Sequence, residues 1–429
     1  MRFVADFHIH SKYSRATSKN MDLENLGKWA RIKGINLLGT GDFTHPLWFK
    51  EIKSKLEPTE TGLYKLKNNV AQKIFNVSDK NNPIFILTSE ISCIYSKNNK
   101  TRKIHILVFS PDIQTVEKIN AYLGRIGNIK SDGRPILGLD AKELAKIVFD
   151  INPNCVIIPA HIWTPWFSIF GSKSGFDSIE ECFEEYTKYI FAAETGLSSD
   201  PEMNRRLSAL DKISLISNSD SHSPSRIGRE SNVFDVKFPE KISYDEVIKI
   251  IKEKNPTNFL YTVEFFPEEG RYHYDGHRLC QVRFSPQESR ANNNICPKCG
   301  KPLTIGVMNR VDELADRAIG DVLPGAVPFK SLIPLEEIIA DAISKGVKTK
   351  AVGEYYNKLI ETLGNEYAVL LDSDRLSIEK ASSSEITEGI IRVRERRVEI
   401  NPGYDGEYGK IKIFRDEEKK RALKQKVLF

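Results

Sequence analysis

The chain has 429 residues, of which 40% are hydrophobic and 28% charged, and its formal net charge is +5. This length predicts two to four domains, and the hydrophobic share is sufficient for a real core. We find no apolar run long enough to cross a membrane and no secretion-signal pattern, so we exclude a membrane protein and expect a cytoplasmic one. The small positive excess permits binding to nucleic acid.

The N-terminal residues predict a strand that ends in two histidines. Phe3, Ala5 and Phe7 alternate with other residues, which is the period of a strand, and His8 and His10 follow. Side chains two residues apart on a strand point the same way. The two imidazoles are therefore expected side by side at the carboxyl end of the strand, as a ligand pair for a borderline metal.

Six further short apolar runs follow, and helical stretches such as 141–149 and 202–210 lie between them. The runs cover residues 35–42, 84–90, 103–109, 155–161, 190–194 and 213–222. Such runs are typical of parallel strands covered by helices, and the alternation predicts a (β/α) barrel. The active site of such a barrel lies at the carboxyl ends of its strands. Most runs end there in His, Asp or Glu, whereas His105 lies inside its run.

The residues expected to converge at that edge combine imidazoles with carboxylates. They are His8, His10, Asp42, Glu90, His105, His161, Glu194, Asp220 and His222. This set exceeds what one metal needs and predicts two or three divalent ions, with a carboxylate bridging two of them. Two close metals lower the pKa of a bridging water and neutralise charge on a phosphoryl group, which favours hydrolysis of a phosphate ester. No Walker-type phosphate loop is present, which argues against NTP-driven work.

These residues, in this order, resemble the polymerase and histidinol phosphatase (PHP) family of metal phosphoesterases over about residues 1–240. The resemblance implies a distorted (β/α)7-type PHP barrel that holds two or three ions of zinc, manganese or magnesium. It implies one metal on His8, His10, Glu90 and Asp220, a second on Glu90, His105 and His161, and a third on His222 with His10 or Asp42 and Glu194. It also implies a catalytic set: His8, His10, Glu90, His105, His161, Asp220 and His222. The family often has Thr-Asp-His where this chain has Gly41-Asp42-Phe43, which departs from the pattern at the third metal.

Two loops at the expected rim carry aromatic and basic residues. Trp163, Trp166 and Lys173 follow the ligand His161, and aromatic rings can stack on an unpaired base or wedge open a duplex. The alternative is a loop packed on the barrel rim. Just past the last ligand lie Arg226 and Arg229, which could bind phosphates or be solvated, and we favour phosphates.

A cysteine cluster in the middle of the chain predicts one structural zinc site. Cys296 and Cys299 belong to a Cys-Pro-Lys-Cys-Gly knuckle, in which the glycine lets backbone amides point at the sulfurs. Cys280 is the third sulfur, but the Cys-x-x-Cys pair that it would begin is broken. We choose His277 as the fourth ligand, with His273 as the alternative. The other three cysteines lie among apolar neighbours and are expected to be buried free thiols: Cys93, Cys155 and Cys182.

The C-terminal third predicts a small helical bundle. Helical spacing covers residues 311–318, 335–344, 350–363 and 384–397, separated by Gly and Pro breaks. Lys348 and Lys350 belong to a basic turn before a helix, which can bind phosphate through charge and backbone amides. Residues 425–429 begin like a sliding-clamp-binding peptide, Gln-x-x-Leu, but lack the closing aromatic pair, so clamp binding and an accidental likeness both stay open.

The full arrangement resembles the endonuclease Q branch of the PHP family. The supporting segments are 194–201, 274–278, 296–304 and 401–406. The resemblance implies a monomeric DNA repair endonuclease that cuts 5′ to uracil, hypoxanthine, xanthine or an abasic site, in duplex or single-stranded DNA. It also implies three parts: a barrel over 1–265, a zinc module over 266–310 and a mainly helical DNA-binding domain over 311–429. Two rivals stay open, a small-molecule phosphatase of the histidinol phosphate type and a non-catalytic DNA-binding accessory protein.

Overall fold

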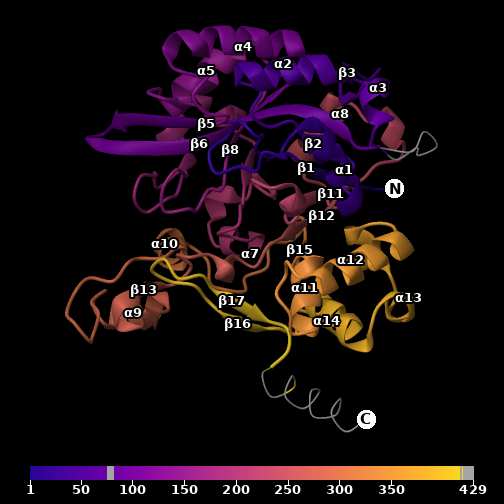
Figure 1. Ribbon diagram of the computed structural model, residues 1–429. Coiled ribbons are helices and arrows are strands. Elements are labelled where there is room, and N and C mark those ends of the chain that lie inside the picture. The colour runs from indigo at the N-terminus through magenta and orange to yellow at the C-terminus, as the bar shows by residue number, and fades with distance from the viewer. Residues whose placement is uncertain (75–81, 416–417, 419–429) are drawn as a thin grey trace.

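The computed structural model describes residues 1–74, 82–415 and 418 of the chain (Figure 1). Its central strands are β1 (Arg2–Asp6), β2 (Leu37–Gly39), β5 (Ile84–Lys97), β11 (Ser231–Asp235) and β12 (Phe259–Glu264). β1 lies between its parallel neighbour β2 and its antiparallel neighbour β11. β5 extends the sheet beyond β2, and β12 extends it beyond β11. β1 is thus a central strand, which places the residues that follow it near the middle of the fold.

Further strands curl this sheet into a distorted barrel. They are β6 (Lys100–Ser110), β8 (Val156–Pro159), β9 (Ala192–Glu194) and β10 (Ser214–Ile216). β6 pairs with both β5 and β8, while β9 and β10 form a separate parallel pair. Isolated contacts connect the pieces: the Ile162 amide donates to the Glu194 carbonyl at 3.0 Å, and Ile9 forms a bridge with Ser221. The predicted α/β barrel is confirmed.

One strand direction differs from the prediction. β6 is antiparallel to β5 and β8, so the strands are not uniformly parallel. In the β5–β6 hairpin Ser92 pairs with His105 and Glu90 pairs with Leu107. Because β6 runs backwards, its first half lies near the barrel edge at which the parallel strands end. This direction explains why His105 reaches the site from inside an apolar run.

Helices cover the barrel, and Figure 1 shows α2, α4 and α5 together on one side of it. They are α1 (Leu23–Lys33), α2 (Pro46–Lys55), α3 (Asn68–Ala71), α4 (Ile113–Ile126), α5 (Ala141–Ile151), α6 (Ile179–Phe183), α7 (Pro201–Asn204) and α8 (Tyr244–Glu253). α1 begins after Asp22, whose carboxylate accepts the Asn25 amide, and it ends at Gly34 with a φ of 89°. The stretch 202–210, predicted as one helix, is divided into α7 and a 3-10 turn at Ser208–Leu210.

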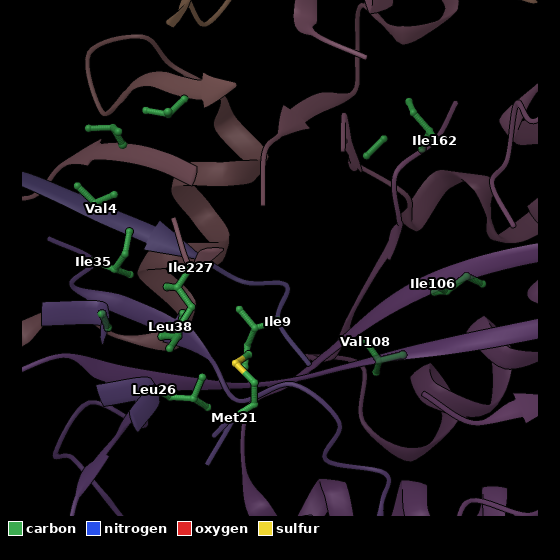
Figure 2. Packing of buried hydrophobic residues seen from close by; sticks show 14 of the residues in the cluster. Val4, Ile9, Met21, Leu26, Ile35, Leu38, Ile106, Val108, Ile162 and Ile227 are labelled. Carbon is green, nitrogen blue, oxygen red and sulfur yellow. The ribbon is translucent and has the colours of Figure 1, made fainter. Parts of the chain in front are cut away.

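The core lies between the sheet and these helices. Figure 2 shows Val4, Ile9 and Leu38 near Met21 and Leu26, and each of the five is at most 2% exposed. Burial of one such side chain is worth roughly 1.5–3 kcal/mol. Ile9 belongs to this core while the two histidines beside it in the sequence do not. Its burial therefore turns both imidazoles away from the core, toward the end of the barrel.

The chain beyond β12 contains a small two-stranded segment, a group of helices and a final hairpin. Its elements are β13 (Asp275–His277), β14 (Val282–Phe284), α9 (Pro286–Ala291), α10 (Val307–Leu314), β15 (Phe329–Ser331), α11 (Leu335–Ala342), α12 (Lys350–Leu363), α13 (Arg375–Ala381), α14 (Ser384–Arg394), β16 (Glu399–Asn401) and β17 (Lys410–Lys412). The mainly helical character of this region is confirmed, although α13 and a π-helix at Ala368–Asp372 were not predicted. In Figure 1 the helices α11 to α14 lie on the side of the barrel opposite α4 and α5.

This region is joined to the barrel at several points. β15 pairs in parallel with β12, and Lys33 of α1 forms a buried ion pair with Glu366 at 2.6 Å. The β16–β17 hairpin returns to the two-stranded segment, where the Tyr274 amide donates to the Gly403 carbonyl. In the part of the chain that the structure describes, no helix combines the length and apolar character needed to cross a membrane. The clamp-like residues 425–429 lie outside the described residues.

Candidate metal centres

Four of the predicted ligands converge at the end of β1. His8, His10, Glu90 and Asp220 offer ligand atoms that all lie within 4.8 Å of one another. Glu90 Oε2 lies 3.4 Å from His8 Nε2 and 3.2 Å from His10 Nε2, and Asp220 Oδ1 lies 3.1 Å from His10 Nε2. Two imidazoles and two carboxylates form a donor set suited to zinc, manganese or iron.

A second group shares one of these carboxylates. Glu90, His105 and His161 also offer ligand atoms within 4.8 Å of one another. Glu90 Oε1 lies 2.7 Å from His105 Nδ1 and 3.0 Å from His161 Nε2. The two oxygens of Glu90 thus face two different groups of histidines. This is the arrangement required of a carboxylate that bridges two neighbouring ions.

The residues present fit a bound cation. His8 Nε2, His10 Nε2 and Asp220 Oδ1 are buried and have no hydrogen-bond partner, although buried polar atoms are normally paired. A cation among these three atoms would satisfy all of them. Burial alone would raise the pKa of Glu90, but His105, Arg134 and His8 more than offset that effect, and the pKa lies well below its ordinary range. Glu90 is therefore ionised at neutral pH, as metal binding requires.

Backbone strain accompanies several of these positions. Asp42, His161 and Asp220 have φ angles of 48°, 29° and 45°, in the left-handed region that residues with a Cβ rarely adopt. Such conformations cost on the order of 1–3 kcal/mol each and cluster at functional sites. The strain at His161 and Asp220 supports a functional reading of the loops after β8 and β10.

Two of the predicted metal ligands contact His8 and His10 at Nδ1, the ring nitrogen that does not face the first ligand group. Glu194 Oε1 lies 3.0 Å from His8 Nδ1, and Asp42 Oδ1 lies 3.0 Å from His10 Nδ1. Both carboxylates are fully buried. A carboxylate at one ring nitrogen fixes the tautomer and orientation of a histidine whose other nitrogen is the ligand. The geometry therefore favours an orienting role for Glu194 and Asp42 over direct coordination.

His222 lies beside the first group without belonging to it. Its ring centroid is 4.4 Å from that of His10, and its Nδ1 lies 2.9 Å from the backbone oxygen of Asp220. In the barrel, the described residues form two groups that could hold an ion, and neither includes His222, Asp42 or Glu194. The third metal thus has no ligand group of its own in this structure.

An arginine that was not predicted also reaches the site. Arg134 Nη1 donates to Glu90 Oε2 at 3.0 Å, and the arginine side chain is 28% exposed. It lies in the loop between α4 and β7 (Ile136–Leu137), where no motif or ligand spacing marks it. Glycine and proline flank it in the sequence, which indicates only a turn.

The predicted DNA-binding residues are in different environments. Trp163 is 1% exposed and its indole N–H donates to Asn204 at 2.7 Å, so it is part of the core and presents no face to a base. Trp166 is 41% exposed and contacts Tyr272 edge-on. Lys173 is exposed. We therefore retain Trp166 and Lys173, and not Trp163, as proposed DNA contacts.

The four predicted basic contacts also differ in their exposure and in their internal contacts. Arg229 is held inside, where its Nε donates to the Ser219 carbonyl at 2.9 Å, so it supports the loop that carries Asp220. Arg226 forms an ion pair with Glu337 of α11. Lys348 and Lys350 are exposed beside α12. Arg229 and Arg226 would each have to break a contact with another segment in order to bind a phosphate. The two lysines would not.

The predicted zinc ligands come together at the two-stranded segment. His277, Cys280, Cys296 and Cys299 offer ligand atoms within 4.8 Å of one another. Burial opposes the effect, but the backbone amides of Lys298 and Cys299 lower the pKa of Cys296 to about 6, which favours the thiolate. These four donors fit a tetrahedral structural zinc site.

The remaining cysteines and the alternative histidine lie elsewhere. His273 is 5% exposed and is not part of this group. Cys93, Cys155 and Cys182 are buried and free. Burial raises the pKa of Cys155 to about 12, so this thiol stays protonated and inert.

A family model described as MJ0043 C-terminal domain matches residues 334–397. The Methanocaldococcus jannaschii protein MJ0043 is 35% identical over 253 residues, which are 58% of this chain and 31% of that protein. The chain thus matches about a third of the length of this relative.

Two solved structures match nearly the whole chain. One is the lesion-specific endonuclease PfuEndoQ from Pyrococcus furiosus, with a TM-score of 0.82, 32% identity, and coverage of 96% of this chain and 95% of that one. The other is endonuclease Q in complex with a 27-mer duplex that has an abasic lesion at the active site, with a TM-score of 0.81, 32% identity and 98% coverage of both chains. Identity and coverage of this extent show that the chain belongs to the endonuclease Q family of enzymes.

Proposed function

We propose that the protein is a metal-dependent DNA repair endonuclease that hydrolyses the phosphodiester 5′ to a deaminated base or an abasic site. The bases would be uracil, hypoxanthine and xanthine, and the products a 3′-hydroxyl and a 5′-phosphate. The observation that carries the proposal is the pair of ligand groups that share Glu90 in a chain similar over its whole length to endonuclease Q. Inside the cell, its substrate would be the DNA of the nucleoid.

The barrel residues would hold two divalent ions, of zinc, manganese or magnesium. His8, His10 and Asp220 would hold one ion and His105 and His161 the other, with Glu90 between them. When bound, such a pair activates water and neutralises charge on a phosphoryl group. His222 and a third ion remain part of the proposal through the PHP resemblance.

The protein contributes orientation as well as ligands. Glu194 uses both oxygens: it contacts the His8 ring and also accepts the backbone amide of His161 at 2.8 Å. It therefore connects one ligand of each group through a single carboxylate. Asp42 accepts the amide of Ser11 at 2.6 Å and contacts His10. Together, Glu194 and Asp42 thus hold both histidines of the segment after β1.

The regions outside the barrel would grip the DNA backbone. The three-part division at 1–265, 266–310 and 311–429 belongs to this proposal. Lys348 and Lys350, together with Lys173 of the barrel, would meet phosphates, which set register without reading sequence. Trp166 is exposed at the rim and would stack beside the displaced nucleotide. A lesion lowers the energy needed to turn a nucleotide out of the stack, because its pairing is already weak.

A cleavage assay tests the proposal. The protein, supplied with Mn²⁺, Mg²⁺ or Zn²⁺, is incubated with duplexes that contain one uracil or one abasic site, with an undamaged duplex, and with histidinol phosphate. We expect one nick 5′ to each lesion, and none in the undamaged duplex. His8→Ala and Asp220→Asn should abolish the nick while duplex binding survives. Hydrolysis of the monoester alone would establish the small-molecule phosphatase, and tight binding without cleavage under any ion would establish the non-catalytic accessory.

A further inference from the structure

The loop that precedes β7 lies against the barrel site and is fixed there by several contacts. The Gly133 amide donates to the Tyr13 carbonyl at 3.1 Å, and the Pro135 carbonyl accepts the Ser92 amide at 3.0 Å. A Cβ added at Gly133 would lie only 2.2 Å from Asp42 Oδ2. The backbone thus approaches the His10-orienting carboxylate as closely as glycine permits, and the residue after it is held in a fixed place.

Asp132 holds the other end of this short turn. Its Oδ1 accepts the amides of Arg15 at 3.3 Å and of Arg134 at 3.1 Å. The loop is thereby connected to the segment after β1 as well as to β5. Its position is set by backbone contacts and not by the side chain of Arg134, so a substitution of that side chain leaves the support intact.

Among the described residues, the Arg134 side chain makes one hydrogen bond, from Nη1 to Glu90 Oε2. The same oxygen lies 3.2 Å from His10 Nε2 and 3.4 Å from His8 Nε2, within the first ligand group. These distances place a permanently charged guanidinium at the edge of the group that would take a cation. Its Nε and Nη2 donors have no side-chain or backbone acceptor among the hydrogen bonds of the described residues, and the side chain is partly open to solvent.

The charge balance changes when the four ligands hold a divalent ion. The negative charge of Glu90 is then taken up by the ion, and the guanidinium loses the charge of the carboxylate to which it donates its hydrogen bond. An oxyanion is the group that restores the balance, and a guanidinium fork matches two phosphate oxygens. We propose that Arg134 is a catalytic residue that binds the non-bridging oxygens of the scissile phosphate, an assignment that rests on the proposed function.

The role follows from where charge develops during hydrolysis. Attack on a phosphodiester increases negative charge on its non-bridging oxygens, and donors fixed in advance at that position stabilise the transition state. Removing one such donor typically lowers kcat by about 10²–10³-fold. Because a terminal phosphate, like the transition state, carries more negative charge than the intact diester, Arg134 should distinguish a DNA end that carries a 5′-phosphate from one that does not.

The test uses the full-length, manganese-loaded protein and three variants. Arg134→Gln removes the charge, Arg134→Lys keeps it without the fork, and Arg125→Gln removes an exposed arginine in the last turn of α4. We expect Arg134→Gln to lower kcat on the abasic duplex by about 100-fold with KM within about threefold, and Arg134→Lys to recover part of the loss. Arg125→Gln should cut at the wild-type rate.

A binding measurement separates this role from a structural one. A nicked duplex with the lesion at the nick is prepared with a 5′-phosphate or a 5′-hydroxyl, and its affinity is measured by fluorescence anisotropy without turnover. The wild type and Arg125→Gln should prefer the phosphate form by about tenfold or more, and Arg134→Gln should lose that preference while binding the same number of metal ions. Equal loss of affinity for both ends, loss of a metal ion, or near-normal cleavage by Arg134→Gln would overturn the assignment. Failure of the wild type to cut any lesion would instead refute the proposed function.

Discussion

The orienting role of Glu194 makes a sharp prediction, because every donor around this carboxylate is known. Oε1 accepts from Asn218 Nδ2 at 2.9 Å, and Oε2 accepts from the His161 amide at 2.8 Å. His8 Nδ1 lies within 3.1 Å of both oxygens. Glu194→Gln keeps the shape but replaces one acceptor with an NH₂ group. In either amide orientation, a donor then faces another donor, at Asn218 or at His161.

The magnitude follows from these contacts. One buried donor left without an acceptor costs about 1–3 kcal/mol of folding stability. Loss of a carboxylate partner behind a ligating histidine typically weakens metal binding by about 10–100-fold, or roughly 1.4–2.7 kcal/mol. We therefore expect a lower unfolding temperature and a metal Kd raised by that factor. The number of ions bound at saturation should not change, because Glu194 supplies no ligand atom to either group.

The assay is competition of the variant against a chromophoric chelator, followed by metal analysis at saturation. Glu117→Gln is the matched control, because this glutamate is 50% exposed and pairs with Lys53 on the surface. A metal affinity equal to that of the wild type would refute the orienting role. Loss of one ion per chain at saturation would show instead that Glu194 is a ligand, as the PHP resemblance implied for a third metal.

Three further predictions concern stability and zinc. Cys299→Ser should lower the zinc content by one ion per chain, and unchanged content in metal analysis would contradict the site. Burial raises the pKa of Glu264 to about 8, so the folded state keeps a proton that the unfolded state releases, and stability should fall by up to roughly 1.4 kcal/mol per pH unit between about pH 5 and pH 8. Burial also raises the pKa of Glu269 to about 8, so Glu264→Gln should reduce that slope in urea unfolding without abolishing it, and a slope equal to that of the wild type would exclude Glu264 as a contributor. Lys33→Met should destabilise the protein by about 3–5 kcal/mol, because it leaves the buried Glu366 carboxylate without its cation, and a shift in midpoint worth less than about 1 kcal/mol would contradict this account.

The sequence predicted the site best where metal-binding side chains also follow the two-residue period of a strand. The alternation through Phe7 predicted that His8 and His10 share a face. The physical reason is that Ile9, between them, is buried in the core. Strand direction was less accessible, because an apolar run buried on both faces looks the same in either direction. The antiparallel β6 was therefore missed, although the odd position of His105 in its run was a usable signal.

Features that depend on tertiary contact could not be predicted. The sequence identified Asp42 and Glu194 as carboxylates near the site, but not which ring nitrogen each would face. Arg134 reaches Glu90 only because its loop folds over the barrel edge, and nothing in its spacing indicates that contact. Trp163 was proposed to contact DNA, with a loop packed on the barrel rim as the alternative, and the side chain of Asn204 provides an internal acceptor for its indole.

The central claim, that Glu90 separates two cation sites at the end of the barrel, is tested most directly by anomalous diffraction from crystals soaked in manganese. The account predicts two anomalous peaks, one beside His8, His10 and Asp220 and one beside His105 and His161, with a carboxylate oxygen of Glu90 facing each. Absence of any peak at these side chains in excess manganese, or side chains that face apart, would contradict it.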